Sequence, residues 1–120
     1  MKVCEILEHL AETRPNVYPD EVLVRWLSDI EGKIHNEIFR ISEPFRPIKV
    51  TSDNDRELLV YEPYTNVYVH YLYSMIEFAN CETVKYANSN ALFNSLYSAF
   101  EADYVKKFRQ PSPSWNNLWG

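Results

Sequence analysis

The side chains most able to bind a metal ion or act as a nucleophile are three histidines and two cysteines. His9, His35 and His70 fall on three different predicted helices, and no H-x-x-x-H, C-x-x-C or glycine-rich phosphate loop occurs. We interpret the histidines as unrelated surface or boundary residues. Cys81 has no histidine near it in sequence, so a Cys–His pair would need contact between distant segments. We therefore expect no catalytic residue, no metal and no cofactor.

The cysteines and the apolar runs indicate in which cellular compartment the chain is expected. Cys4 and Cys81 are too few for a disulfide framework, and the N-terminus does not resemble a signal peptide. The longest apolar runs are far shorter than a membrane span. We expect a reducing compartment, the cytoplasm, and no association with a membrane.

Two further groups of polar residues lie on predicted helices. Asn88, Asn90 and Asn94 fall in the first turns of the last helix, where asparagine is a poor helix former. A loose helix start is one explanation, and side-chain hydrogen bonds to a neighbouring helix or subunit are another; the sequence does not separate them. Acidic groups elsewhere are interpreted as solvated helix faces, and these are Glu5, Glu8, Glu12, Asp29 and Glu31.

The charge of the chain is acidic and unevenly distributed. The formal net charge is −5 and the pI is about 5.1, which disfavours non-specific binding to nucleic-acid phosphates. Residues 67–105 carry four acids against Lys85 alone, whereas Lys106, Lys107 and Arg109 leave the last fifteen residues at +3. The simpler explanation of this cluster is that cations at a helix C-terminus stabilise the helix dipole.

The last segment, QPSPSWNNLWG, is expected to form a flexible tail over residues 110–120, because it is polar and contains two prolines. It carries Trp115 and Trp119, and tryptophan is favoured at protein interfaces. Both indoles folding back onto the helices of the same chain is the alternative. We predict a partner interface made of Lys106, Lys107, Arg109, Trp115 and Trp119.

Apolar residues at helical spacing predict a mainly α fold, a bundle of about four helices in a single domain over residues 1–109. The first helix covers residues 2–13, and the second covers about 19–40 with Pro19 in its first turn. Gly32 inside the second helix marks either the close approach of another backbone or a tolerated defect. The two apolar stripes are Val3, Ile6, Leu7 and Leu10, then Leu23, Trp26, Leu27, Ile30, Ile34 and Ile38.

The two C-terminal helices are predicted to be long and to meet at Asn80–Cys81. The third starts after Glu62–Pro63, with the proline in its first turn, and ends near Asn80, a residue that tolerates a left-handed backbone. The fourth runs from about Glu82 to Phe108. The predicted buried faces are Tyr68, Leu72, Met75, Ile76 and Ala79, then Leu92, Phe93, Leu96, Tyr97, Ala99, Phe100 and Tyr104.

Residues 41–60 break the helical pattern at Pro44 and Pro47. Two short apolar runs, residues 48–51 and 58–61, flank a polar turn at residues 52–55. This pattern predicts a small β-hairpin or an extended insertion near residues 45–61.

Three stretches resemble the small head–tail connector (adaptor, or head-completion) proteins of tailed bacteriophages and prophages. They are YPDEVLVRWLSDIEGKIHNEIF at residues 18–39, LLVYEPYTNVYVHYLYSMIEFAN from residue 58, and ETVKYANSNALFNSLYSAFEADY up to residue 104. The resemblance covers about residues 3–108 and includes the R-W-L-x-x-x-E-G run and the E-P-Y run. The chain departs from the pattern at Cys81, where a glycine is expected, and at Pro19, where a hydroxyl N-cap is expected. We therefore expect a more continuous junction between the last two helices.

The resemblance implies a structural role without catalysis. Such proteins form a ring, commonly dodecameric, that docks under the portal, extends the DNA channel and joins the capsid to the next neck or tail component. It implies self-association and passage of DNA without specific binding. It also implies a place at the head–tail junction of the virion, and in the host cytoplasm during assembly. The high aromatic content, 15%, suits a subunit with two interfaces. The alternative is a small cytoplasmic α-helical protein-interaction module without catalysis.

Overall fold

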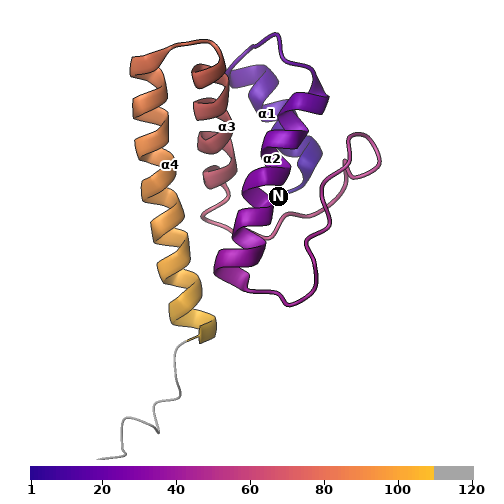
Figure 1. Cartoon of the computed structure of the whole chain (residues 1–120), viewed down its shortest axis with the longest axis vertical. Helices are drawn as coiled ribbons and strands as arrows, with labels where there is room; N and C mark the ends of the chain where they lie inside the picture. Colours follow the sequence, from indigo (N-terminus) through magenta and orange to yellow (C-terminus); the bar gives the residue numbers. More distant parts are fainter. Residues whose placement is uncertain (110–120) are drawn as a thin grey trace, which may run out of the picture.

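The computed structural model describes residues 1–109, which form four α-helices and one non-helical insertion (Figure 1). This confirms the predicted mainly α fold with two long C-terminal helices. The proposed tail, residues 110–120, lies outside the described residues. The helices are α1 (Val3–Thr13), α2 (Asp20–Ile34), α3 (Asn66–Ala79) and α4 (Thr83–Tyr104), and the π-helical turns η1 (His35–Phe39) and η2 (Val105–Arg109) continue α2 and α4.

The first helix is tied to the insertion at its N-terminus. The N–H groups of Val3 and Cys4, which have no partner inside α1, donate to the carbonyls of Arg56 (3.2 Å) and Asn54 (2.9 Å). The predicted stripe of α1 faces the core, with Leu7 half-buried at its edge. The insertion therefore caps α1 in place of a hydroxyl side chain.

The second helix is the centre of the fold and packs against both α1 and α3. Its predicted stripe is buried except for Trp26, which is half-buried with its ring edge-on to Tyr18 (ring centroids 5.5 Å apart). The helix begins at Asp20, so Pro19 is the N-cap residue rather than part of the first turn. Pro19 has no N–H to leave unpaired there.

A buried polar contact in the last turn of α2 corrects the sequence interpretation of Glu31. This residue is 1% exposed: one carboxylate oxygen accepts from the Tyr68 hydroxyl (2.5 Å) and the other from the Leu59 N–H (2.9 Å). The Tyr68 hydroxyl also accepts from the Val60 N–H at 2.9 Å. Glu31 is not part of a solvated face; it joins α2, α3 and the insertion.

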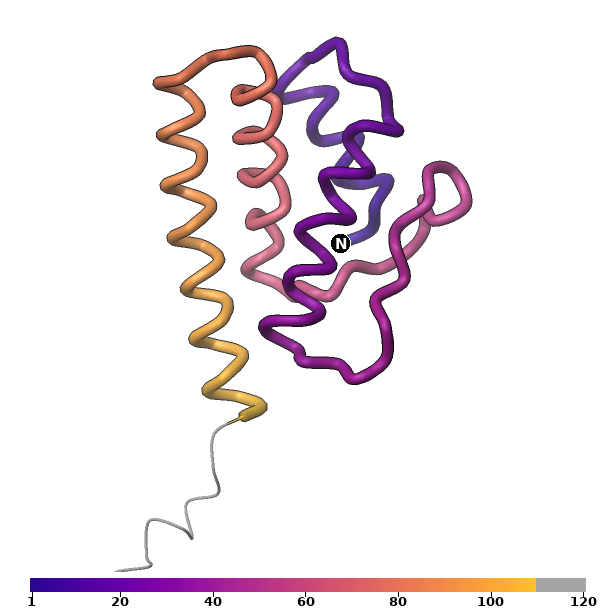
Figure 2. The backbone as a smooth tube through the Cα atoms, viewed as in Figure 1, coloured from indigo at the N-terminus to yellow at the C-terminus, as the bar shows by residue number. Residues whose placement is uncertain are grey.

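The insertion, residues 40–65, contains no strand within the described chain and leaves α2 as a long loop (Figure 2). An isolated bridge joins Lys2 to Glu57, and the predicted hairpin between residues 48–51 and 58–61 is not formed. The expected polar turn is present. Asp53 organises it by accepting from the Lys49 N–H (2.8 Å) and from Arg46 (3.2 Å).

Gly32 is explained by a side chain of the insertion. A Cβ at this position would lie 3.1 Å from a ring carbon of Phe45, so the glycine allows the ring to lie on the helix. The neighbouring turn of α2 supplies Ser28, whose hydroxyl accepts from the Ile48 N–H at 3.0 Å. The close approach predicted at Gly32 thus involves an aromatic ring and not another backbone.

Helices α3 and α4 run antiparallel and share the most extensive helix–helix contact (Figure 1). The reversal between them is sharp: Cys81 has φ 60°, its N–H donates to Phe78 O (3.1 Å), and the Glu82 N–H donates to Glu77 O (2.9 Å). This is the Schellman arrangement, with a cysteine where glycine is usual. The left-handed residue is Cys81 and not Asn80, and the junction is not continuous.

The starts and the buried faces of these two helices differ in part from the prediction. Helix α3 begins at Asn66, so Pro63 lies in the preceding turn, where the Tyr64 N–H donates to Tyr61 O (2.9 Å). Leu92 is 52% exposed. Ala79 and Ala99 are exposed as well, and the buried residues of α4 are Ser89, Phe93 and Phe100. The side chains of Asn88, Asn90 and Asn94 form no hydrogen bond within residues 1–109.

Candidate partner interface

Aromatic side chains from three parts of the chain meet where α4 ends. The spacing of four residues along α4 and η2 places Phe100, Tyr104 and Phe108 in one row. The end of η1 adds Phe39, whose ring lies 4.4 Å from that of Tyr104, and the insertion adds Tyr61, whose ring lies 5.1 Å from that of Phe100. Phe108 is 63% exposed. We call this cluster the aromatic foot: Phe39, Tyr61, Tyr64, Phe100, Tyr104 and Phe108.

The predicted cationic residues lie at the aromatic foot, but two of them already have partners. Lys107 forms an ion pair with Asp103 (3.1 Å) and lies over the Tyr61 ring. The Arg109 guanidinium lies over the Tyr104 ring at 5.9 Å. Lys106 is exposed and forms no ion pair within residues 1–109. Lys107 and Arg109 therefore have a local structural role in addition to any role in binding.

Asp103 and Tyr61 are coupled at the same place. The Tyr61 hydroxyl donates to Asp103 at 2.8 Å. Burial, together with this bond to a carboxylate, raises the pKa of Tyr61 to about 12. The bond from Tyr61, followed by the Lys107 ammonium, lowers the pKa of Asp103. Tyr61 is thus a neutral donor at physiological pH and Asp103 is charged. Trp115 and Trp119 of the predicted interface lie outside the described residues.

A second apolar surface lies at the other end of α4, beside the turn between α3 and α4. Phe78 is 64% exposed, and its ring lies 5.4 Å from the ring of Tyr86. Val84 nearby is 76% exposed. An open groove of about 550 Å³ runs here, which we call the turn groove; its lining residues are Glu77, Phe78, Ala79, Cys81, Glu82, Thr83 and Tyr86.

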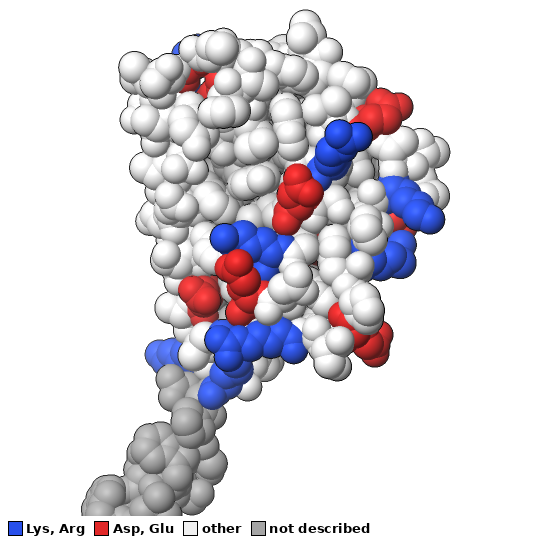
Figure 3. All heavy atoms as spheres, viewed as in Figure 1, with Lys and Arg blue, Asp and Glu red and all other residues white. Residues whose placement is uncertain are grey.

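The outer face of α4 connects these two ends and carries no charge. Lys85 and Glu101 are the nearest charged residues on the helix, and none lies between them. Figure 3 shows that charged side chains gather over α2 and near the lower end of α4, while the surface over the middle of α4 is uncharged. Exposed side chains on this face include Leu92 and several small residues, which are Ala87, Ala91, Ser95, Ser98, Ala99 and Ala102.

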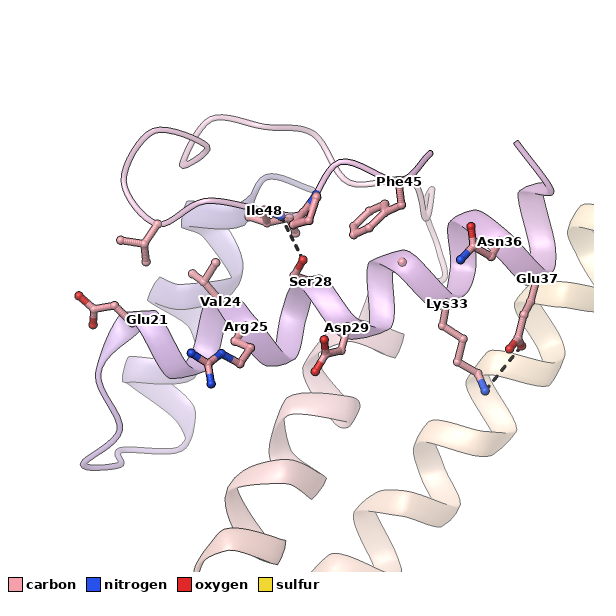
Figure 4. Close-up of a pocket in the computed structure, with 13 residues that line it drawn as sticks. Glu21, Val24, Arg25, Ser28, Asp29, Lys33, Asn36, Glu37, Phe45 and Ile48 are labelled. Carbon is pink, nitrogen blue, oxygen red and sulfur yellow. Dashed lines mark hydrogen bonds and ion pairs between the residues drawn. The ribbon is translucent and has the colours of Figure 1, made fainter. Parts of the chain in front are cut away.

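A groove of about 670 Å³ separates α2 from the first half of the insertion (Figure 4). It is lined by Gly32 of α2 and by Phe45 of the insertion, whose ring lies against the glycine. Lys33 and Glu37 form an ion pair at one end (3.6 Å), while Arg25 and Asp29 add one charge of each sign. The groove is open and carries charges of both signs, unlike the enclosed, mostly apolar pocket that is typical of a small-molecule site.

A buried ion pair near the turn groove was also missed by the sequence reasoning. Arg14, from the loop after α1, is paired with Glu77 of α3, which is 2% exposed, and the guanidinium lies over the Tyr73 ring at 4.2 Å. Within the described chain the second carboxylate oxygen of Glu77 has no hydrogen-bond partner. The apolar neighbours of Glu77 and Glu31 along their helices were the signal available, because both acids interrupt buried stripes.

The residues first considered for chemistry lie apart on the fold. His35 is buried against the Phe45 ring, which corrects its interpretation as a surface or boundary residue. His9 and His70 are half-buried, and burial lowers the pKa of His70. Both cysteines, Cys4 and Cys81, have free thiols. No group of three metal-ligating side chains gathers within residues 1–109, and no helix there is long and apolar enough to cross a membrane.

Comparison of the chain with family models, curated proteins and solved structures gave no match.

Proposed function

We propose that the chain is a structural subunit of a phage head–tail connector ring. In this role it docks under the portal, extends the DNA channel and joins the capsid to the next neck or tail component. The three stretches that resemble connector proteins form α2 with η1, the end of the insertion with α3, and α4. These parts carry most of the buried core, together with the exposed Phe78 and Leu92.

The observation that carries the proposal is the pair of exposed apolar surfaces at opposite ends of α4. One is the aromatic foot with Phe108, and the other is the turn groove with Phe78. A subunit of a cyclic ring needs two different surfaces, because each neighbour is met by a different side of the molecule. Exposed aromatic groups of this kind are typical of interface anchors.

The charge distribution supports a channel that releases DNA. Net charge −5 per subunit multiplies in a ring, and binding of the DNA backbone requires compensating cations. Lys107 is already neutralised by Asp103, so the basic end of the helix offers fewer free charges than its sequence indicates. We propose that DNA passes through the ring without specific binding, and that the portal and a tail-side protein are the partners, at the head–tail junction of the virion.

Assembly on a purified portal would test the proposal. The chain is mixed with portal rings, and the mixture is analysed by negative-stain electron microscopy and sedimentation. We expect an added ring of density under the portal. As a matched pair, Phe108→Glu should abolish the added ring, whereas Glu8→Gln, on an exposed face of α1, should leave it intact. Absence of any association with portal rings would overturn the proposal.

A second candidate is a small α-helical interaction module without catalysis. The groove between α2 and the insertion favours it, because a single partner segment fits an open groove of mixed charge. This function predicts a monomer that binds one partner chain in a complex of equal stoichiometry and forms no ring. Arg25→Glu in the groove should then abolish binding, while Phe108→Glu should have no effect.

A further inference from the structure

A row of charged side chains of alternating sign runs along one face of α2 and continues into η1. Its members are four residues apart, about 6 Å along the helix axis, and they are Glu21, Arg25, Asp29, Lys33 and Glu37. All of them are exposed, and all of them line the groove between α2 and the insertion. Figure 3 shows acidic and basic side chains alternating over this part of the surface. We call these five residues the charged row.

The two halves of the charged row differ in whether the chain itself pairs them. Alternating charges on a helix are typical of an exposed face whose members pair with one another. Lys33 and Glu37 do so (3.6 Å), and Glu37 also accepts from the Tyr97 hydroxyl of α4 (3.0 Å). Within residues 1–109 the first three members form no ion pair and no side-chain hydrogen bond. The first half of the row, with the signs minus, plus and minus, is therefore available to a partner.

The insertion contributes apolar side chains to the same groove, among them Phe45, Pro47 and Val50. In Figure 4 the Phe45 side chain lies on the upper side of α2, whereas those of Arg25 and Asp29 lie on its lower side. An occupant of the groove therefore meets apolar groups along one edge and charges along the other. An extended segment suits such a groove, because its successive side chains point to opposite faces.

The spacing of the charges also fits an extended segment. Side chains two residues apart on an extended chain are separated by about 6.6 Å, close to the spacing of about 6 Å along the charged row. Five extended residues span about 13 Å, against about 12 Å of helix between Glu21 and Asp29. Three alternate side chains of a short segment can therefore each meet one of the three unpaired charges.

We propose that this groove binds an extended peptide segment of a partner protein in which every second side chain is charged, in the order plus, minus, plus, with apolar residues between. The positive charges meet Glu21 and Asp29, the negative charge meets Arg25, and the apolar residues face the insertion. The order of signs reads the same in both directions, so charge alone leaves the direction of the segment open. The inference goes beyond the proposed function, because it names the chemistry of a partner segment and requires neither a ring nor a portal.

Binding of short synthetic peptides tests the inference. The matched peptide carries lysine, valine, glutamate, valine and lysine between uncharged polar flanks, and the opposite peptide exchanges lysine with glutamate. Fluorescence polarisation at low salt measures both affinities for the full chain. The matched peptide should bind about tenfold more tightly, because the opposite peptide turns three pairs of opposite charge into three pairs of like charge. A salt concentration of about 1 M should remove the preference.

A protein with reversed charges provides the control for specific pairing. The triple variant Glu21→Lys, Arg25→Glu and Asp29→Lys should prefer the opposite peptide, by about the same factor. Glu8→Lys, on an exposed face of α1, changes the net charge by the same amount and should keep the native preference. Circular dichroism checks that both variants keep their helices.

Three results would overturn the inference. The first is equal affinity of the native chain for the matched and opposite peptides, or a triple variant that keeps the native preference. The second is tighter binding of a peptide with the same charges four residues apart, which would mean that the occupant is a helix. The third is association of the native chain with the triple variant while neither peptide binds, which would mean that the charged rows of two copies meet.

The outcome is separable from that of the proposed function, because the peptides are measured without portal rings. If the native chain shows no preference between the peptides but assembles on portals, the inference is wrong and the connector function stands. If the preference and its reversal are observed but no association with portals occurs, the groove binds such a segment and the connector function is wrong.

Discussion

Helices α2 and α4 differ in how much of their surface the described chain buries. Helix α2 has 15 residues and buries seven of them, whereas α4 has 22 residues and buries three. The polar side chains of α2 that face the core are hydrogen-bonded, as at Glu31 and Ser28. Along α4, exposed Leu92 lies on a face without charge. A helix such as α2, whose core-facing polar groups are hydrogen-bonded within the chain, stabilises the fold. A helix such as α4, which leaves an uncharged face exposed, has surface available to a partner.

The largest effect is expected at Glu31. Glu31→Ala leaves the Tyr68 hydroxyl and the Leu59 N–H buried without an acceptor, so the free energy of unfolding should fall by about 3 kcal/mol. Urea denaturation measures it. Asp29→Ala, an exposed acid on the same helix, is the control and should change stability by less than about 0.5 kcal/mol. Equal effects of the two substitutions would show that the contact does not hold the fold.

The second effect tests the fit between α2 and the insertion. Gly32→Leu must displace the Phe45 ring and should lower the free energy of unfolding by about 2 kcal/mol. Gly32→Ala needs only a small shift of the ring, and its better helix propensity, about 1 kcal/mol, offsets that shift. Thermal unfolding of the pair measures the difference. A leucine variant as stable as the alanine variant would contradict the contact.

The third expected effect is a pH dependence of the free energy of unfolding, caused by Glu31 in α2. Burial raises the pKa of the Glu31 carboxyl above its ordinary value of 4.5, against the opposing effect of the hydrogen bonds from Tyr68 and Leu59. The resulting stabilisation is complete below pH 4.5. It is lost as the pH rises through the raised pKa, because the folded state keeps a proton that the unfolded state has released.

Glu31→Gln removes this titration. The free energy of unfolding of the variant should therefore fall less than that of the native chain as the pH rises above 4.5. Urea denaturation across that range gives both curves. Parallel curves would mean that Glu31 titrates alike in the folded and unfolded states.

The fourth effect concerns the turn before α4. Cys81 holds φ 60°, a conformation that favours glycine, so Cys81→Gly should raise the free energy of unfolding by about 1 kcal/mol. Ala79→Gly, in the last turn of α3, should lower it by about 1 kcal/mol. Opposite signs at two nearby positions distinguish relief of backbone strain from a general effect of glycine.

The smallest effect on stability is expected on the face of α4. Leu92 is half exposed, so Leu92→Glu should change the free energy of unfolding by less than about 0.5 kcal/mol. The same charge should nevertheless abolish association with portal rings, whereas Leu92→Ala should preserve it. If Leu92→Glu destabilises the isolated chain by several kcal/mol, α4 is a core helix like α2, and the comparison fails.

The sequence by itself determined the helices and the approximate ends of each. Apolar residues at a spacing of three and four placed α1 and α2 correctly, because burial of one helical face repeats along the chain whatever packs against it. The break at Asn80–Cys81 was placed because asparagine tolerates a left-handed backbone, although the left-handed residue is Cys81. The candidate cations at Lys106, Lys107 and Arg109 were likewise found from sequence, but their pairing with Asp103 and with aromatic rings was not.

Only the tertiary structure decided which polar groups are buried and which apolar groups are exposed. Glu31 contacts residues 28 and 37 positions away, so no local pattern distinguishes it from the exposed Asp29. Leu92 has the spacing of a buried residue but is exposed, because α4 packs chiefly on α3 and no other segment of residues 1–109 covers it. Periodicity fixes the direction in which a side chain points, whereas burial depends on what distant segments place in front of it.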